Sequence, residues 1–232
     1  DTLGDRMKAY EKIQSHVLSP RTPIIIRVDG KAFHTFTRGL EAFDPSLMAM
    51  MDKAATEICK QVSGAQIAYV RSDEISILLF YYKRFNSKPY FNNELQKICS
   101  VTASIAAATA TMESASVFGK VKPAVFDSRV FTLPEDEVCN YFLWRQQDWT
   151  RNSVQMLARS MFSHKECNNK NNSELQEMCF VKGKNWNDLP TSHKRGRCVV
   201  HTEGMGWHLD QEIPVFSQDR DYINKLLVRE EG

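Results

Sequence analysis

The chain has 232 residues, of which 42% are hydrophobic and 25% are charged, and its formal net charge at pH 7 is +2. These fractions are ordinary for a soluble globular protein, and no apolar run reaches the roughly 18–20 residues that span a bilayer, which excludes a membrane-spanning helix. The near-neutral charge says little about partners. The length suits one large domain or one domain with an appendage.

The six cysteines are scattered along the chain, and none belongs to a Cys-x-x-Cys pair. This pattern favours reduced thiols over a disulfide framework or a zinc site. The first residues have no signal-peptide pattern and no initiator Met, so we expect the start to be trimmed. A cytoplasmic location is the resulting prediction.

The first expected elements are a helix over residues 5–17 and a strand that begins at residue 24. The strand consists of three isoleucines followed by Arg and Val, which is typical of a buried strand. Asp29 stands where this strand should end. Gly30 follows it, and glycine lets a backbone turn sharply and approach a ligand closely.

The elements after this strand alternate between helical and strand patterns. Residues 33–36 suggest a short helical turn packed under Asp29. The further elements are a helix over residues 45–62, strands over 66–71 and 75–80, a helix over 92–116 and a strand over 125–133. This β-α-β-β-α-β order predicts an α+β fold of the ferredoxin-like type, an antiparallel sheet with helices on one face. RNA-binding domains and polymerase palms share that order, so it does not identify the function.

The second part of the chain is predicted to be helical with a terminal hairpin. We expect a helix over residues 135–161, a polar loop over 168–173, short helices over 174–182 and 219–227, and hairpin strands over 198–202 and 207–212. The predicted organisation is a palm-like catalytic core over residues 1–133 and an extension over residues 134–232, packed on the core as a single compact unit.

Two acidic groups are predicted to meet at one edge of the sheet. A hairpin turn between the second and third strands would lift Asp73 to the edge where Asp29 lies. Two carboxylates held together repel each other unless a cation offsets their charge. Mg²⁺ suits this role, because it takes one or two carboxylates together with phosphate oxygens. The pattern indicates metal-assisted nucleotidyl transfer, in which metal ions activate an attacking oxygen and neutralise phosphates.

Backbone groups and cations near these acids complete the predicted site. The Gly30 carbonyl is a candidate metal ligand, and the amides of residues 30–34 could cradle a triphosphate. Lys31 or Lys97 could neutralise that triphosphate. Glu74 is harder to place, because strand alternation points it away from Asp73 unless a tight turn intervenes.

Each of these signals has a plain structural alternative. An Asp-Gly pair after a strand is most often a turn, a Ser-Asp-Glu hairpin tip is usually solvated, and a helical lysine such as Lys97 is usually on the surface. Residues 193–197 form a cationic cluster that is either a solvated loop or a phosphate contact. The shared position of the acids within the β-α-β-β-α-β order favours the functional interpretation.

Residues 27–34 read R-V-D-G-K-A-F-H and resemble the nucleotide- and metal-binding motif of tRNA-histidine guanylyltransferases, R-x-D-G-x-x-F-H. Residues 72–74 match the S-D-E motif of that family, and residues 126–129 and 144–148 match two further stretches. The resemblance extends over about residues 5–200. It implies a polymerase-type palm that adds nucleotides to the 5′ end of RNA. The RNA 5′-monophosphate is first activated, often by ATP, and the 3′-hydroxyl of the incoming nucleotide then attacks.

The resemblance also assigns roles to residues. It implies two Mg²⁺ ions held by Asp29, Asp73 and the Gly30 carbonyl. The implied catalytic residues are Asp29, Asp73 and Glu74. ATP, GTP or other nucleoside triphosphates are the implied substrates, tRNA is the implied partner, and a homotetramer is the implied assembly. The implied nucleotide-binding residues are Asp29, Gly30, Lys31, Ala32, Phe33, His34, Ser72, Asp73 and Lys97.

Departures from the family pattern bear on the substrate. Eukaryotic members carry H-I-N-N after the W-R-Q-x-D stretch, whereas residues 150–153 read T-R-N-S here. In this respect the chain is similar to the guanylyltransferase-like proteins of bacteria and archaea, which prefer template-dependent repair of tRNAs shortened at the 5′ end. Asp44 and Glu94 replace basic residues of the family, so we expect Lys31 or Arg38 to compensate in triphosphate binding.

The predicted function is template-dependent 3′-to-5′ addition of nucleotides at the tRNA 5′ end. Three alternatives stay open, namely G addition at position −1 of histidine tRNA, a palm-type nucleotide cyclase, and a non-catalytic RNA-binding module. The acidic pair speaks against the last of these. Candidates for RNA contact, which could instead form surface salt bridges or a charged loop, are Arg145, Arg151, Asn152, Lys194 and Arg195.

Overall fold

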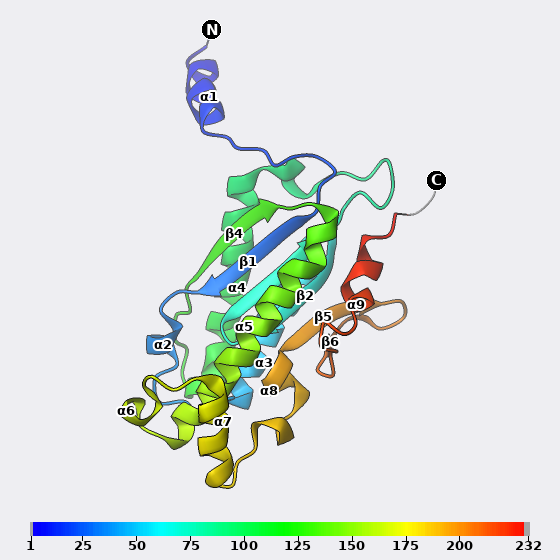
Figure 1. Cartoon of the computed structure of the whole chain (residues 1–232). Coiled ribbons are helices and arrows are strands. Elements are labelled where there is room, and N and C mark those ends of the chain that lie inside the picture. The colour runs from blue at the N-terminus through cyan, green and yellow to red at the C-terminus, as the bar shows by residue number, and fades with distance from the viewer. Residues whose placement is uncertain (1, 230–232) are drawn as a thin grey trace.

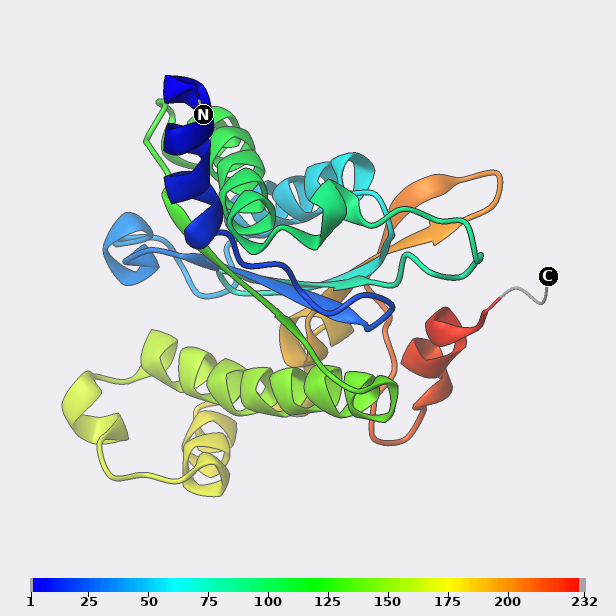
Figure 2. The same cartoon turned by 90° about the horizontal axis from the view of Figure 1, so that it is seen from above.

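An antiparallel sheet runs through the centre of the molecule, with helices on both of its faces (Figures 1 and 2). Within residues 2–229, which the computed structural model describes, the sheet has six strands in the order β4-β1-β3-β2-β5-β6. Each strand is antiparallel to its neighbours. The strands are β1 (Ile24–Gly30), β2 (Ala65–Arg71), β3 (Glu74–Leu79), β4 (Phe126–Thr132), β5 (Arg197–Thr202) and β6 (Gly206–Asp210).

The first four strands and two long helices form the predicted β-α-β-β-α-β unit. Helices α3 (Pro45–Gln61) and α4 (Leu95–Phe118) pack against each other on one face of the sheet. Asp44 starts α3 by accepting a hydrogen bond from the Leu47 amide at 2.8 Å, with Pro45 at the start of the helix. The prediction of an α+β, ferredoxin-like fold is confirmed.

A second helical layer covers the opposite face of the sheet. Helix α5 (Glu135–Met161) runs along this face (Figure 2), where Val138 packs in one cluster with Ile25 and Leu78 of the sheet. Strands β1 and β3 bury apolar residues on both of their faces, so each face needs a cover. Both helices of the β-α-β-β-α-β unit thus lie on one face, as predicted, and the opposite face is covered by α5 of the C-terminal extension.

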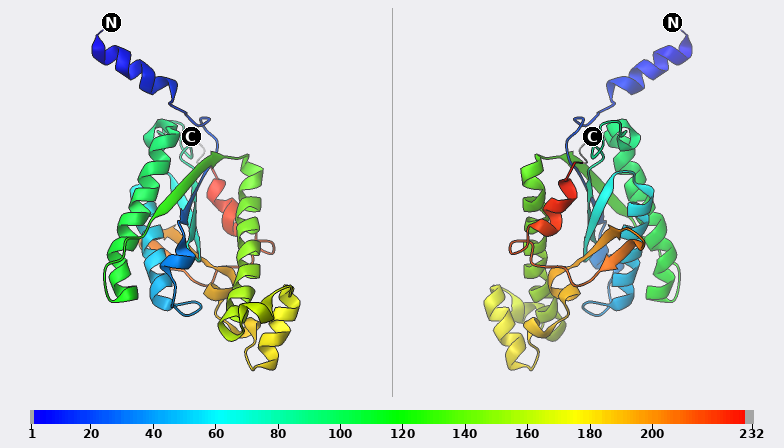
Figure 3. Two further views of the ribbon diagram at one scale, coloured as in Figure 1. Left: turned by 90° about the vertical axis from the view of Figure 1, so that its left-hand side faces the viewer. Right: turned by 90° about the vertical axis from the view of Figure 1, so that its right-hand side faces the viewer.

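The C-terminal part of the chain joins the same sheet. Strand β5 pairs with β2, where Val200 lies opposite Ile67, and β6 pairs with β5, so the predicted hairpin extends the sheet. In Figure 3 the yellow helices α6 and α7 lie at one end of α5. The remaining elements are α2 (Phe33–Phe36), α6 (His164–Cys167), α7 (Asn172–Val181), α8 (Thr191–Arg195), α9 (Asp221–Asn224) and the 3-10 turns Tyr90–Asn93, Trp186–Asp188 and Lys225–Leu227.

Helix α1 (Leu3–Ile13) projects away from the rest of the molecule (Figures 1 and 3). None of its residues is buried, and Tyr10 and Ile13 are 68% and 72% exposed. The helix ends earlier than predicted, because the chain beyond it becomes extended and Val17 forms an isolated bridge with Glu94. Across residues 2–229, no helix has the length and apolar content needed to cross a membrane.

Candidate active site

Asp29 lies at the end of β1 beside two other carboxylates. It is directly opposite Glu74 on β3 and Asp127 on β4. Directly opposed residues of antiparallel strands point to the same face of a sheet, and here that face is the one covered by α5. Burial, and then the charge of Asp127, raise the pKa of the Asp29 carboxyl. No local pattern marks Asp127 as part of the acidic site, because only the pairing of β4 with β1 brings it to Asp29.

A tight turn brings Asp73 to the same edge. Residues 72 and 73 connect β2 to β3, and Ser72 adopts a left-handed φ of 44°. The Gly30 amide donates a hydrogen bond to the Asp73 carbonyl at 3.0 Å, so the turn is tied to the end of β1. Burial raises the pKa of the Asp73 carboxyl, and the charge of Asp29 adds to the rise. A cation bound between the two acids would relieve this repulsion.

Gly30 is packed so closely that only glycine fits. A Cβ atom at this position would lie 2.3 Å from the ring of Phe33. That ring stacks on Phe36 at a centroid distance of 4.7 Å and lies 5.1 Å from the ring of Phe126. Ala32 begins the α2 turn with a left-handed φ of 54°. The backbone that follows β1 is therefore anchored beside the acids by an aromatic cluster.

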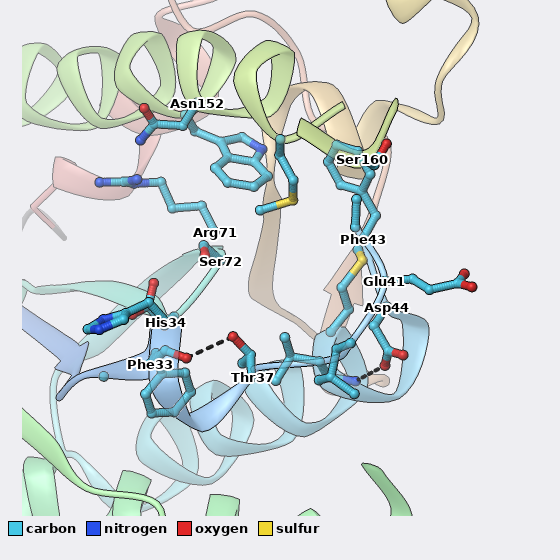
Figure 4. Close-up of a pocket in the computed structure, with 18 of the residues that line it drawn as sticks. Phe33, His34, Thr37, Glu41, Phe43, Asp44, Arg71, Ser72, Asn152 and Ser160 are labelled. Atoms are coloured by element: carbon cyan, nitrogen blue, oxygen red, sulfur yellow. Dashed lines mark hydrogen bonds between the residues drawn. The ribbon is translucent and has the colours of Figure 1, made fainter. Parts of the chain in front are cut away.

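A cavity of about 740 Å³ opens between this backbone and α5 (Figure 4). Its volume lies within the roughly 300–1,000 Å³ of small-molecule sites. In Figure 4, Asn152 reaches the cavity from α5, while Phe33 and Thr37 lie on the opposite side. The predicted site residues that line it are Gly30, Ala32, Phe33, His34, Ser72, Asp73 and Asn152.

One wall of the cavity contains Phe43 and Trp149. Phe43 stacks flat on His193, with ring centroids 4.6 Å apart, and meets Trp149 edge-on at 6.4 Å. Its φ of 57° is a strained, left-handed conformation that these ring contacts hold in place. Burial lowers the pKa of His193. No local spacing in the sequence connects these three residues, so only the folded chain brings them together in this wall.

Glu74 is buried beneath α5 in an ion-pair network. Arg145 of α5 donates to both carboxylate oxygens of Glu74 at 2.8 Å, and Arg71 donates a further bond at 2.8 Å. Burial raises the pKa of Glu74 to about 7, although Arg71 opposes the rise. Glu74 thus points to the same face of the sheet as Asp29, while its carboxylate holds α5 to the sheet.

The predicted RNA-binding residues on α5 differ in their exposure. Arg145 is 6% exposed and bonds to Glu74 and Asp148, so the structure gives it an internal role in place of the predicted RNA contact. Arg151 is exposed and pairs with Asp148 at 3.3 Å. Asn152 is exposed and lines the cavity. Only the last two are therefore placed to meet a ligand.

The cationic cluster of residues 193–197 is neither a loop nor fully solvated. It spans the end of α8 and the start of β5. Lys194 donates to the carbonyl of Asn187, and Arg195 donates to the carbonyl of Ile213. Each bond uses one of the several donors of its side chain, so RNA contact by these two residues stays a prediction.

The two lysines predicted to bind triphosphate lie outside the lining of the cavity. Lys97 belongs to α4, on the sheet face opposite α5, and pairs with Glu94 at 3.1 Å. Lys31 is exposed to solvent. The cations that line the cavity are instead Arg71, Arg159 and Arg197, of which Arg197 is buried and pairs with Asp52 at 2.6 Å. The structure therefore does not bring Lys31 or Lys97 into this cavity.

The groups that could hold a metal are the carboxylates of Asp29 and Asp73 and the carbonyl of Gly30. Among residues 2–229, no three His, Cys, Asp or Glu side chains form a metal site by themselves. A pair of carboxylates still suits Mg²⁺, which keeps waters and takes substrate phosphates in its remaining positions. Burial first, and then the charge of a neighbouring acid, raise the pKa of both carboxyls, so a bound cation would offset a cost that the fold imposes on their charged forms.

A ferredoxin-like sheet with an acidic pair at one edge, next to a cavity of nucleotide size, defines a palm-type nucleotidyltransferase. The family model described as tRNAHis guanylyltransferase matches residues 4–134, and the chain belongs to this family. A relative from Dictyostelium discoideum, named probable tRNA(His) guanylyltransferase, is 28% identical over 211 residues, which cover 83% of this chain and 80% of that protein.

Solved structures agree with this assignment. A bacterial tRNA(His) guanylyltransferase-like protein in complex with ATP is 39% identical, with a TM-score of 0.93 over 97% of this chain and 99% of that chain. Another structure of this description, in complex with GTP, is 37% identical, with a TM-score of 0.83 over 98% of this chain and 99% of that chain. The Saccharomyces cerevisiae tRNA(His) guanylyltransferase, at 23% identity and a TM-score of 0.72 over 90% of this chain and 98% of that chain, shares the fold.

Proposed function

We propose that the chain adds nucleotides in the 3′-to-5′ direction to shortened tRNA 5′ ends, with the opposite strand selecting each nucleotide. One observation carries the proposal, namely that Asp29 and Asp73 lie at one sheet edge beside a cavity large enough for a nucleoside triphosphate. The likeness to bacterial proteins in complex with ATP and GTP supports nucleoside triphosphates as substrates. The sequence T-R-N-S at residues 150–153, in place of H-I-N-N, favours repair over G addition to histidine tRNA.

Two Mg²⁺ ions fit the site through Asp29, Asp73 and the Gly30 carbonyl. When bound, such ions neutralise the charge of the phosphates and lower the pKa of the attacking hydroxyl. The chain itself fixes the acids, since the hydrogen bond from Gly30 to Asp73 joins the two segments that carry them. His34 and Ser72 line the cavity beside them and would orient the nucleotide.

The two predicted parts of the chain contribute different elements to this function. Residues 1–133 supply the acids, and residues 134–232 supply the opposite wall through Trp149 and Asn152. Arg151, exposed next to Asn152, remains a candidate for contact with tRNA. A tRNA substrate and the free thiols of all six cysteines, each within residues 2–229, agree with a cytoplasmic location.

The exposed helix α1 supports a homotetrameric assembly. Its apolar side chains recur at helical spacing and are left uncovered, which is typical of an interaction surface. These side chains are Leu3, Met7, Tyr10 and Ile13. A double substitution, Tyr10→Ser with Ile13→Ser, should lower the mass measured by light scattering, and should lower the thermal midpoint only by the stability that assembly had added. A wild-type chain that is monomeric at every concentration would contradict the tetramer.

The function is tested by nucleotide addition to a 5′-monophosphorylated tRNA that lacks its first nucleotide, with Mg²⁺ and ATP. Each nucleotide is offered in turn, and the base opposite the gap is varied. Incorporation that follows the opposite base supports template-dependent repair. Addition of G alone, and only to histidine tRNA, would replace repair with G addition at position −1. A cyclic product from nucleotide alone, or RNA binding without any addition, would refute both.

A further inference from the structure

A second, smaller cavity adjoins the nucleotide cavity. It measures about 200 Å³ and lies between the last turns of α5, helix α6 and the start of α7. Gln155 and Arg159 line both cavities, so the two share a wall. The other residues that line the smaller cavity are His164, Cys167, Asn168, Asn169, Lys170 and Leu175.

The lining of the smaller cavity suits an anion. Arg159 and Lys170 bring positive charge, and His164 and Asn168 add groups that donate hydrogen bonds. Within the described part of the chain, no carboxylate lines this cavity. Over the same residues, 2–229, neither Arg159 nor Lys170 has an ion-pair partner. The cavity therefore holds cations whose charge the chain does not neutralise.

Two acids of this segment are engaged at the starts of helices. Glu166 accepts a hydrogen bond from the Ser163 amide at 2.8 Å, at the start of α6. Glu174 accepts one from the Asn171 amide at 2.7 Å, at the start of α7. Each bond is half of a capping box, which holds the carboxylate at the helix terminus. Neither acid is therefore available to pair with the cations of the cavity.

The size of the smaller cavity and its position along α5 indicate what kind of anion it could bind. The cavity is smaller than the roughly 300–1,000 Å³ of ordinary small-molecule sites, so it suits a phosphate group better than a second nucleotide. Asn152, Gln155 and Arg159 recur at helical spacing and line the larger cavity from α5. The helix rises about 10 Å between the first and the last of these residues. A strand that passes Asn152 would need only a nucleotide or two to reach the smaller cavity.

We propose that the smaller cavity binds a backbone phosphate of the tRNA close to the reacting 5′ end, with Arg159 and Lys170 as its cationic contacts. The proposal rests on the proposed function, since it takes tRNA as the substrate of the neighbouring site. Contacts of this kind position a strand without reading its sequence. The same cations would also suit the triphosphate of a bound nucleotide, and the experiment separates these two sources of phosphate.

The test compares RNA binding with nucleotide binding in the full chain. Kd is measured for a 5′-monophosphorylated tRNA that lacks its first nucleotide, and for ATP, at several salt concentrations. The variants are Arg159→Gln and Lys170→Gln, with Lys165→Gln as the matched control, because Lys165 is an exposed lysine of α6 that does not line the cavity. All three positions are exposed, so the fold should tolerate the changes.

We expect each of the two variants to weaken tRNA binding about twofold to fivefold, as loss of an exposed ion pair does. The slope of log affinity against log salt should fall by roughly 0.7–0.9 for each lost phosphate contact. The ATP affinity of Lys170→Gln, whose side chain lines only the smaller cavity, and both affinities of the Lys165→Gln control should match those of the wild type.

Two results would overturn the inference. One is a tRNA affinity and a salt slope that equal those of the control in both variants. The other is an ATP affinity of Lys170→Gln that falls as much as its tRNA affinity, which would assign the cations of the smaller cavity to the nucleotide. If the wild-type chain binds no tRNA, the proposed function is overturned as well. If the wild type binds and extends tRNA, and both variants bind tRNA as the wild type does, only this inference is overturned.

Discussion

The Gly30 amide donates a hydrogen bond to the Asp73 carbonyl across 3.0 Å. This bond joins the end of β1 to the turn between β2 and β3, and thereby holds two mutually repelling carboxylates at one edge of the sheet. The repulsion contributes to the raised pKa of Asp73, to which the charge of Asp29 adds. The backbone has thus built a site whose stability should depend on a bound cation.

The close contact between Gly30 and Phe33 predicts a severe effect of one added methyl group. In Gly30→Ala the new Cβ would lie 2.3 Å from the ring, so the ring or the backbone must move. A displacement of about 1 Å near reacting groups costs about 100-fold in rate. Overpacking of this kind also costs about 1–3 kcal/mol of stability. Single-turnover rates of nucleotide addition and thermal unfolding measure the two effects.

Gly4→Ala is the control for this substitution. Gly4 lies in the exposed helix α1, where the nearest atom to an added Cβ is 3.8 Å away, on Thr2. The rate of nucleotide addition and the thermal midpoint of Gly4→Ala should both match those of the wild type. A Gly30→Ala variant with normal rates would show that the packing of Gly30 does not position the acids.

Removal of one carboxylate should change the response to Mg²⁺. Asp29→Asn and Asp73→Asn should each abolish nucleotide addition, yet melt at a higher temperature than the wild type without Mg²⁺, because one of two repelling charges is gone. Mg²⁺ should raise the thermal midpoint of the wild type, since a ligand that binds only the folded state stabilises it. Mg²⁺ should raise the thermal midpoint of the two Asn variants by less than it raises that of the wild type. Asp127, with its side chain 54% exposed, provides the control Asp127→Asn, which should keep most of the Mg²⁺ response.

Two arginines on one helix should separate structural and RNA-binding roles. Arg145→Met removes one of the two arginines that pair with the buried Glu74, and should destabilise the protein by about 3 kcal/mol. Arg151→Met changes an arginine whose side chain is 62% exposed, and should shift stability by less than about 0.5 kcal/mol while weakening tRNA binding. Urea unfolding and tRNA titrations measure these effects. Equal stability of the two variants would contradict the network around Glu74.

His193 should make the protein less stable in mild acid. Burial lowers its pKa, so between the unfolded-state pKa of about 6.5 and the lower folded-state value, the unfolded chain binds more protons. Stability is therefore lost as the pH falls through this window. His193→Phe keeps an aromatic ring against Phe43 but cannot titrate, so its thermal midpoint should fall less between pH 7.5 and pH 5.5. His201→Phe, at an exposed position, should respond to pH as the wild type does.

Local patterns were sufficient to predict the elements that carry the acids. The apolar run over residues 75–80 and the Asp-Gly pair after residue 28 each involve near neighbours only. Strand propensity of a short apolar run and sharp turning at a glycine are short-range properties, so they can be recognised without the fold. The R-x-D-G and S-D-E motifs predicted the family to which the chain belongs, and the match of the family model to residues 4–134 confirms it.

Lys97 shows where local patterns fail. Its helix was predicted correctly, but that helix packs on the face of the sheet opposite α5, and the lysine pairs with Glu94. The side of a sheet on which a helix packs depends on how the whole chain closes, because both faces of β1 and β3 are apolar and either could receive it.

The surroundings of the acids likewise depend on contacts between distant segments. Pairing of β4 with β1 places Asp127 opposite Asp29, and the path of α5 across the sheet joins Arg145 to Glu74. No spacing within a single element encodes which element will lie opposite it. Short-range propensities therefore determined the strands, the turn and the acidic pair, whereas long-range packing decided which cations, rings and cavities surround them.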